Sequence, residues 1–154
     1  FIGFSPVAWL TSPSLALFSL SLVSAWRMIG YNMILFLAGL QGIPKQYEEA
    51  AKIDGANKIA ILKYITLPLL MPTTFFVVIM SIMGTFQSFI QPFIMTQGGP
   101  GDSTNLSVYY LYRVAFDYLE LGKGATMSFI LFLIILILTF IQIRSWRTGY
   151  RGFE

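Results

Sequence analysis

The sequence of 154 residues contains no cysteine and no histidine, and only 11% of its residues are charged. A typical soluble domain has about 25% charged residues. Without cysteine and histidine the chain can form no disulfide, no thiolate nucleophile and no imidazole acid–base site, and it lacks the usual zinc ligands. We therefore expect no catalytic site, no metal site and no cofactor in this chain, and we expect lipid rather than water around much of it.

The positive charge of the chain is modest and is placed in a particular way. Ten Lys and Arg against seven Asp and Glu give a net charge of +3, and the basic residues lie at the ends of apolar runs. Basic residues beside membrane-spanning segments commonly lie near lipid headgroups. This distribution indicates a membrane protein and argues against binding of nucleic acid.

Three stretches are apolar and long enough to cross a bilayer as helices, which takes about 20 residues each. They cover residues 15–41, 67–95 and 125–143, and Arg27 is the only charged residue among them. They are connected by residues 43–66, which we call the inter-span segment, and by residues 96–124, which we call the second loop. The sequence thus predicts an all-α, polytopic helical membrane protein with three transmembrane helices.

The distribution of Lys and Arg predicts the orientation of these helices, because cytoplasmic segments carry the excess of positive charge. The positive residues after the first and third stretches are Lys45, Lys52, Lys58, Lys63, Arg144, Arg147 and Arg151, whereas the second loop holds only Arg113 and Lys123. We expect a multi-pass protein of the bacterial or archaeal inner membrane, with the amino end outside and the carboxyl end in the cytoplasm. Because the number of spans is odd and the chain does not begin with Met, we expect residues 1–154 to be the carboxyl-terminal part of one transmembrane domain in a longer protein.

The second loop divides into a turn and a short helix. Its first part, residues 97–102, is rich in Gly and Pro, which favour turns. Apolar residues then recur at helical spacing with charged residues on the opposite side: Val108, Leu111, Tyr112, Ala115 and Leu119 against Arg113, Asp117 and Glu120. This pattern predicts a short extracytoplasmic amphipathic helix, whose aromatic residues suit either the headgroup region or packing over the helices.

The inter-span segment predicts two short helices joined by a corner. Pro44 is favoured at a first helical position, and good helix formers follow it as far as Asp54. Gly55 stands where a helix commonly ends in left-handed geometry, and Asn57 can cap a second helix that continues towards Pro68. We expect a bent helix pair in the cytoplasm.

The first helix of this pair has side chains that suit a docking surface. Ala50 and Ala51 have little bulk and allow a partner to approach closely, while Glu48, Glu49 and Asp54 offer carboxylates to basic groups. The segment is also longer than a plain connection between two helices requires. We interpret it as a docking element.

The same segment contains the triplet Glu-Ala-Ala, then Gly after three residues, Ile after nine more, and Leu-Pro after one more. The residues that form this pattern are Glu49, Ala50, Ala51, Gly55, Ile65, Leu67 and Pro68. The pattern resembles, without a gap, the EAA loop of ABC importer permeases. Residues 26–30, 67–70, 98–100 and 108–112 are also similar to the carbohydrate-type permeases exemplified by the maltose and glycerol-3-phosphate uptake systems, so the resemblance covers essentially the whole chain.

This resemblance implies that the inter-span segment forms a coupling helix in a cleft of a separate ATPase subunit. By position, it assigns the polar contact to Glu49, the close fit to Ala50 and Ala51, the corner to Gly55 and the start of the next span to Pro68. The partners that it implies are a second homologous permease subunit, two ATPase subunits and an extracytoplasmic solute-binding protein. In agreement with a separate ATPase, the chain contains no glycine-rich loop of the P-loop type for nucleotide phosphates.

Polar residues within the first span are candidates for a substrate path. The spans hold no Asp or Glu, which disfavours a carrier driven by ions or protons. Ser24, Arg27 and Tyr31 share roughly one helix face. Two interpretations of Arg27 stay open: it lines the path, or it pairs with a structural partner on another helix.

A second polar stripe follows the second span and comprises Ser81, Gly84, Thr85 and Ser88. Small residues and hydroxyls support close helix packing, and they also suit a neutral lining for a sugar. Because the resemblance implies that the spans beside the EAA loop border the path, we favour the lining. The predicted function is the transmembrane subunit of an ABC importer for a sugar or related polyol, and the alternative is a membrane assembly or interaction protein without transport.

Overall fold

The computed structural model describes residues 7–150, and it describes side chains as far as residue 146. The side chain of Arg147 and the whole of Arg151, which contributed to the predicted orientation, lie outside the described residues. Residues 7–150 form helices and connecting loops without a strand, which confirms the all-α prediction. In chain order the elements are α1 (Pro13–Gln41), α2 (Lys45–Ile53), α3 (Lys58–Ile61), η1 (Leu62–Thr66), α4 (Leu67–Phe86), η2 (Pro92–Thr96), α5 (Ser107–Tyr112), η3 (Arg113–Asp117) and α6 (Leu121–Tyr150).

Three helical stretches are long and apolar enough to cross a membrane, namely Pro13–Gln41, Lys58–Phe86 and Leu121–Trp146. Only 6% to 11% of the most apolar part of each stretch is buried within the protein. A helix that is apolar on all sides needs lipid or further helices around it. The prediction of three transmembrane helices is confirmed.

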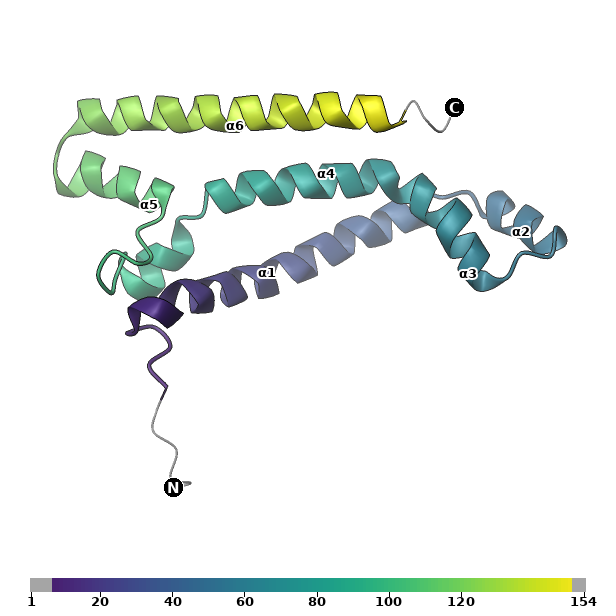
Figure 1. Cartoon of the computed structure of the whole chain (residues 1–154), viewed down its shortest axis with the longest axis horizontal. Coiled ribbons are helices and arrows are strands. Elements are labelled where there is room, and N and C mark those ends of the chain that lie inside the picture. Colours follow the sequence, from purple (N-terminus) through teal and green to yellow (C-terminus); the bar gives the residue numbers. More distant parts are fainter. Residues whose placement is uncertain (1–6, 151–154) are drawn as a thin grey trace, which may run out of the picture. The chain divides into compact units, whose positions relative to one another are not determined.

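The second of these stretches begins and ends earlier than residues 67–95, where the sequence places it. At its start, α3 and η1 continue into α4 without a break, so Lys58 and Lys63 lie within the helix. At its end, α4 stops at Phe86, and a separate short helix that contains η2 follows (Figure 1). Hydropathy marks the residues on both sides of this break as apolar, and for that reason it does not reveal the break.

Three of the elements, η1, η2 and η3, are single π turns, in which an amide bonds to the carbonyl five residues earlier. In η1 the amide of Leu67 donates to the carbonyl of Leu62, directly before Pro68, which has no amide to donate. A π turn of this kind is a recognised cause of helix bending. Accordingly, α3 departs from the line of α4 at η1 (Figure 1).

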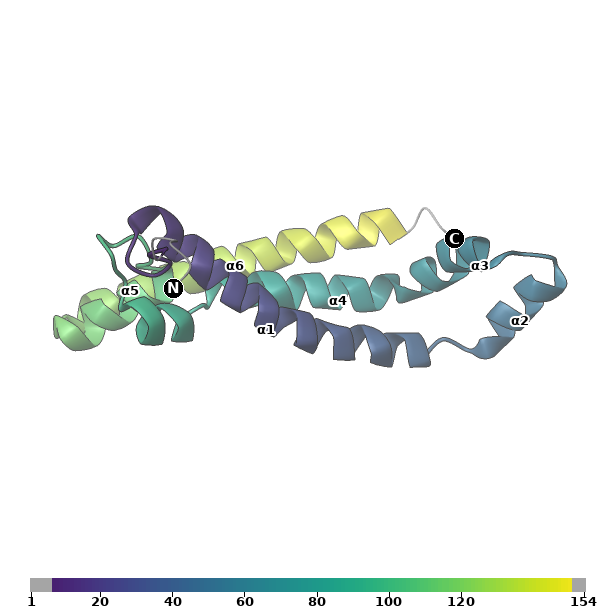
Figure 2. The ribbon, with the colours of Figure 1, turned by 90° about the horizontal axis from the view of Figure 1, so that it is seen from below.

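The described residues pack as two compact units, of which one comprises residues 28–81 and the other comprises residues 7–27 and 82–150. In the unit of residues 28–81, the pair of α2 and α3 projects beyond the ends of α1 and α4 (Figure 2). Few side chains of this unit are buried, and the buried ones are Ile61 on α3 and Leu70 and Val77 on α4. The helix pair is therefore a protrusion rather than part of a packed core.

Four aromatic rings cluster in the other unit. Phe89 and Phe93 stack with their ring centroids 5.1 Å apart, and their centroids lie 5.3 to 6.3 Å from those of Tyr109 and Tyr112. Tyr109 is buried, whereas Tyr118 is 51% exposed. This cluster supports the packing interpretation for the aromatic residues at the start of α5.

The helix predicted in the second loop is present as α5 and η3, but it ends sooner. Leu119, expected on its apolar face, has a positive φ of 57° and is 82% exposed, so it lies beyond the helix. The buried residues are Tyr109 and Val114. The expected face is wrong at its far end because the helix ends at Asp117, two residues before Leu119.

Candidate functional site

The first helix of the inter-span segment begins at Lys45, one residue later than expected. Pro44 has an extended backbone, with φ −61° and ψ 128°, and occupies the capping position. The helix then runs for nine residues without a buried side chain. Within residues 7–146, only Ala51 of α2 is half-buried, and the other residues of this helix are exposed.

The corner after α2 is held by backbone hydrogen bonds around a left-handed glycine. Gly55 has a φ of +80°, which confirms the expected left-handed helix end. The amide of Gly55 donates to the carbonyl of Lys52 at 3.1 Å, and the amide of Ala56 donates to the carbonyl of Ala51 at 2.9 Å. Together these two bonds form a Schellman motif, which satisfies carbonyls that the helix end leaves without partners.

The start of the second helix is fixed by the side chain of Asn57. Its Oδ1 accepts a hydrogen bond from the amide of Ala60 at 2.8 Å, so Asn57 caps α3 as the sequence predicts. Only a few residues separate this cap from the end of α2. The angle between α2 and α3 is therefore set by the conformations of residues 54–57.

The two neighbouring glutamates of α2 have different surroundings. The carboxylate of Glu48 lies 2.8 Å from Nζ of Lys52, one helical turn away. The hydrogen bond from Lys52, and then its positive charge, lower the pKa of Glu48 below its ordinary value. Glu49 is exposed and makes no ion pair with any residue that the structure describes. Of this pair, Glu49 is the carboxylate available to a partner.

Two apolar side chains of α2 are strongly exposed, and sequence reasoning did not select them. Ile53 is 88% exposed and Tyr47 is 54% exposed. On the second helix Ile59 is 76% exposed. Contiguous exposed apolar patches commonly mark a contact with a partner, whereas single exposed apolar residues are ordinary. The available signal was the presence of Tyr and Ile between charged residues on a nine-residue helix.

The polar residues expected along the first span lie on α1. Ser24 is half-buried, Arg27 is exposed and Tyr31 is 55% exposed. Arg27 has no ion-pair partner within the part of the chain that the structure describes. The pairing interpretation of Arg27 would therefore require a partner beyond these residues.

The polar stripe expected on the second span is interrupted. Ser81, Gly84 and Thr85 lie on α4, but Ser88 lies past its end at Phe86. The hydroxyl of Ser88 instead donates to Oε1 of Gln91 at 3.3 Å. The prediction extended the helical spacing across a break, so Ser88 does not share the helix of the other three.

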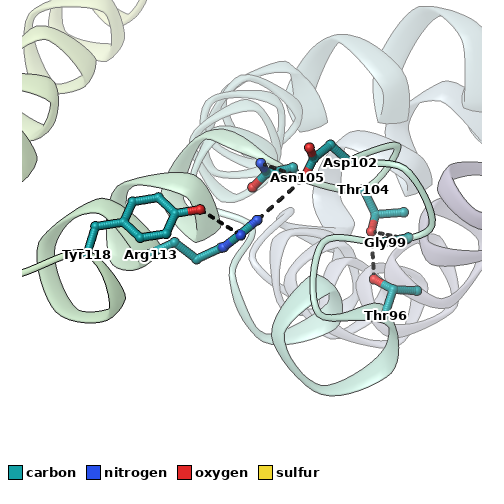
Figure 3. Close-up of polar contacts among 7 residues, drawn as sticks. All are labelled: Thr96, Gly99, Asp102, Thr104, Asn105, Arg113 and Tyr118. Carbon is teal, nitrogen blue, oxygen red and sulfur yellow. Dashed lines mark hydrogen bonds and ion pairs between the residues drawn. The ribbon is translucent and has the colours of Figure 1, made fainter.

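The turn of the second loop is fastened by polar side chains (Figure 3). The hydroxyl of Thr104, which is fully buried, donates to the carbonyl of Gly99 at 2.7 Å and lies 2.7 Å from the hydroxyl of Thr96. Arg113 lies 3.4 Å from the carboxylate of Asp102 and donates to the hydroxyl of Tyr118 at 2.7 Å. These contacts tie the turn to α5 and η3.

Residues 1–144 match the family model described as "Binding-protein-dependent transport system inner membrane component". The chain is 39% identical over 144 residues to the arabinooligosaccharides transport system permease protein AraP of Bacillus subtilis (strain 168), a match that covers 93% of this chain and 46% of that protein. It is 37% identical over 145 residues to the lactose transport system permease protein LacF of Rhizobium radiobacter, with 92% and 49% covered.

A third relative is the sn-glycerol-3-phosphate transport system permease protein UgpA of Yersinia pseudotuberculosis serotype I (strain IP32953). The identity is 40% over 130 residues, which covers 84% of this chain and 44% of that protein. The chain thus spans about half the length of these curated relatives.

Proposed function

Because the chain belongs to the family of binding-protein-dependent transport system inner membrane components, we propose that it forms part of the translocation path of an ABC importer. In this proposal the inter-span segment transmits the movement of separate ATPase subunits to the spans. ATP hydrolysis takes place on those subunits. The names of the relatives, which are permeases of transport systems, support a transport subunit rather than an assembly protein.

The observation that carries this proposal is the projecting helix pair. Two apolar helices frame a short helix with no buried residue, and hydrogen bonds on both sides of Gly55 fix its exit angle. A rigid, uncovered protrusion can transmit a displacement, whereas a flexible loop would absorb it. We assign the coupling surface to Glu49, Ala50, Ala51, Asp54 and Gly55, with Ile65, Leu67 and Pro68 at the entry to the span.

The structure suggests how such a surface would bind. Glu49 offers a free carboxylate, while the exposed Ile53 and Tyr47 offer apolar area. An apolar anchor surrounded by polar contacts is the usual composition of a binding hot spot. We propose the cleft of an ATPase subunit as the partner surface. The complete importer would contain two such subunits, a second homologous permease and an extracytoplasmic solute-binding protein.

The path that we propose lies beside α1 and α4. Ser24, Arg27 and Tyr31 would line it from the first helix, and Ser81, Gly84 and Thr85 from the second, with Ser88 near its end. Hydroxyls and an aromatic ring recognise neutral polyhydroxy compounds through many modest hydrogen bonds. The sugar and polyol names of the relatives support a sugar or related polyol as the substrate.

The family and the three apolar helices make this a multi-pass membrane protein. We propose that it lies in the bacterial or archaeal inner membrane with the inter-span segment in the cytoplasm. The basic residues Lys45, Lys52, Lys58 and Lys63 support this orientation. Membrane-impermeant maleimide should then label Ser107→Cys, at an exposed position of the second loop, in sealed, right-side-out cells, and it should label Glu49→Cys only after the membrane is opened.

Cysteine cross-linking in the assembled importer tests the coupling role. The chain has no native cysteine, so Glu49→Cys or Ala51→Cys introduces a single reactive position into it. Each should cross-link to the ATPase subunit with a short bifunctional reagent, whereas the control Ser107→Cys, at an exposed position of the second loop, should not. A complex that is intact and active but shows no cross-link at either position would reject the proposal.

A further inference from the structure

One close contact joins the two helices that carry the inter-span segment. A Cβ added at Gly39 on α1 would lie 2.5 Å from Oγ1, 2.9 Å from Cγ2 and 3.1 Å from Cβ of Thr73 on α4. All three atoms belong to one short, β-branched side chain, and its Cβ is fixed to the helix, so a change of rotamer does not clear the space. Any side chain at position 39 therefore requires the two helices to separate.

The neighbouring residues show that this contact belongs to a packed face within the unit of residues 28–81. On α4 the buried residues Leu70 and Val77 lie three positions before and four positions after Thr73. On α1 the half-buried residues Asn32 and Leu35 lie seven and four positions before Gly39. Residues at these spacings share one face of a helix. On each helix, the residue at this contact therefore shares one face with buried or half-buried residues.

The contact is also placed where it controls the protrusion. Helix α1 ends at Gln41, two positions after Gly39, and the continuous helix on the other side begins at Lys58, fifteen positions before Thr73. At 1.5 Å per residue this leaves about 20 Å of helix between the contact and the corner at Gly55. The helix that begins at Lys58 thus connects the corner at Gly55 to the Gly39–Thr73 contact, and a displacement of the corner can reach α1 through this contact.

We propose that Gly39 is a positioning residue, which lets α1 and α4 meet at Thr73 so that both spans follow the helix pair as one body. This inference rests on the proposed coupling role of the inter-span segment. It adds a residue within the membrane part of the chain that touches neither the ATPase subunit nor the substrate. We expect Gly39 to determine how much of the movement of the helix pair is transmitted to the two spans.

The test compares ATP hydrolysis with and without the loaded solute-binding protein, in proteoliposomes that contain the complete importer with full-length permease. Gly39→Ala should lower this stimulation about fivefold or more, while the basal rate and the amount of copurified ATPase subunit stay unchanged. Gly30→Ala is the matched control, because Gly30 lies on the same helix with nothing within 4 Å of an added Cβ. It should keep the wild-type stimulation.

A compensating variant separates loss of coupling from loss of folding. Thr73→Gly removes all three atoms that oppose a Cβ at position 39, so the double variant Gly39→Ala/Thr73→Gly should regain most of the stimulation relative to Thr73→Gly alone. If Gly39→Ala prevents assembly, recovery of assembly in the double variant supports the contact, and no recovery overturns the inference. Equal stimulation of Gly39→Ala and Gly30→Ala also overturns it.

The cross-link from position 49 shows which statement has failed. If neither Glu49→Cys nor Ala51→Cys, each in an otherwise wild-type and active importer, forms a cross-link to the ATPase subunit, the proposed function fails, and this inference fails with it. If the cross-link forms and Gly39→Ala remains fully coupled, only the inference about Gly39 is wrong.

Discussion

Replacement of Gly55 is the perturbation whose cost follows most directly from the structure. With a φ of +80°, this residue occupies the left-handed region, and nothing lies within 4 Å of a Cβ added there. Gly55→Ala therefore introduces backbone strain without a steric clash. The left-handed conformation costs an L residue about 1–2 kcal/mol, and Asn tolerates it better than other residues. Because about 1.4 kcal/mol changes an equilibrium constant tenfold, we expect Ala to shift the equilibrium against the correctly bent helix pair by about fivefold to thirtyfold.

The assay is again the stimulation of ATP hydrolysis by loaded binding protein in the reconstituted importer. The stimulation should decrease in the order Gly, Asn, Ala, Val at position 55, because Asn adopts positive φ with less strain and a β-branched residue with more. Gly122→Ala is the control, since Gly122 lies near the start of α6 and also has open space around an added Cβ. If Ala matches Gly, or if Asn is no better than Val, while the complex still assembles, the left-handed geometry of residue 55 does not control coupling.

Three further predictions concern single side chains. Asn57→Ala removes the 2.8 Å hydrogen bond that caps α3 and should destabilise this helix by about 1 kcal/mol. The stimulation of ATP hydrolysis should fall with Ala and be kept with Asn57→Asp, whereas an equal loss with Asp would contradict the capping role. Glu49→Gln should weaken coupling more than Glu48→Gln, because Glu48 already pairs with Lys52 on its own helix. The difference is measured as binding of the ATPase subunit, and the reverse order would contradict the assignment of Glu49 as the contacting carboxylate. Thr104→Val leaves buried partners unsatisfied and should destabilise the second loop by about 1–3 kcal/mol; limited proteolysis should cleave this loop faster than in the exposed-site control Ser107→Ala, and equal rates would argue against the fastening role.

The local features of the inter-span segment could be predicted because each depends on a residue and its near neighbours. Left-handed geometry at Gly55 and capping by Asn57 follow from the chemistry of those two residues, and both are present. The three apolar helices follow from composition. The different surroundings of Glu48 and Glu49 were also within reach, because Lys52 follows Glu48 at the spacing that forms ion pairs on a helix.

The errors have a common physical cause, which is that periodic patterns continue through points where the helix does not. Ser88 has the spacing of the α4 stripe but lies beyond the end of that helix, and Leu119 has the spacing of the α5 face but lies past a π turn. The Gly39–Thr73 contact had no sequence signal at all, since it joins two helices that are far apart along the chain. Which glycine of a span meets a neighbouring helix is decided by packing, and one sequence alone does not contain that information.

We propose that the helix pair of residues 45–61 is seated on a nucleotide-hydrolysing partner. The most direct measurement is a density map of the full-length protein in a lipid nanodisc, reconstituted with its ATPase subunits and second permease. We expect α2 to be buried against an ATPase subunit, with Ile53 and Glu49 at the contact. A map that shows α2 surrounded by solvent in the intact assembly, or on the face of the membrane opposite the ATPase subunits, would show that α2 is not the coupling surface.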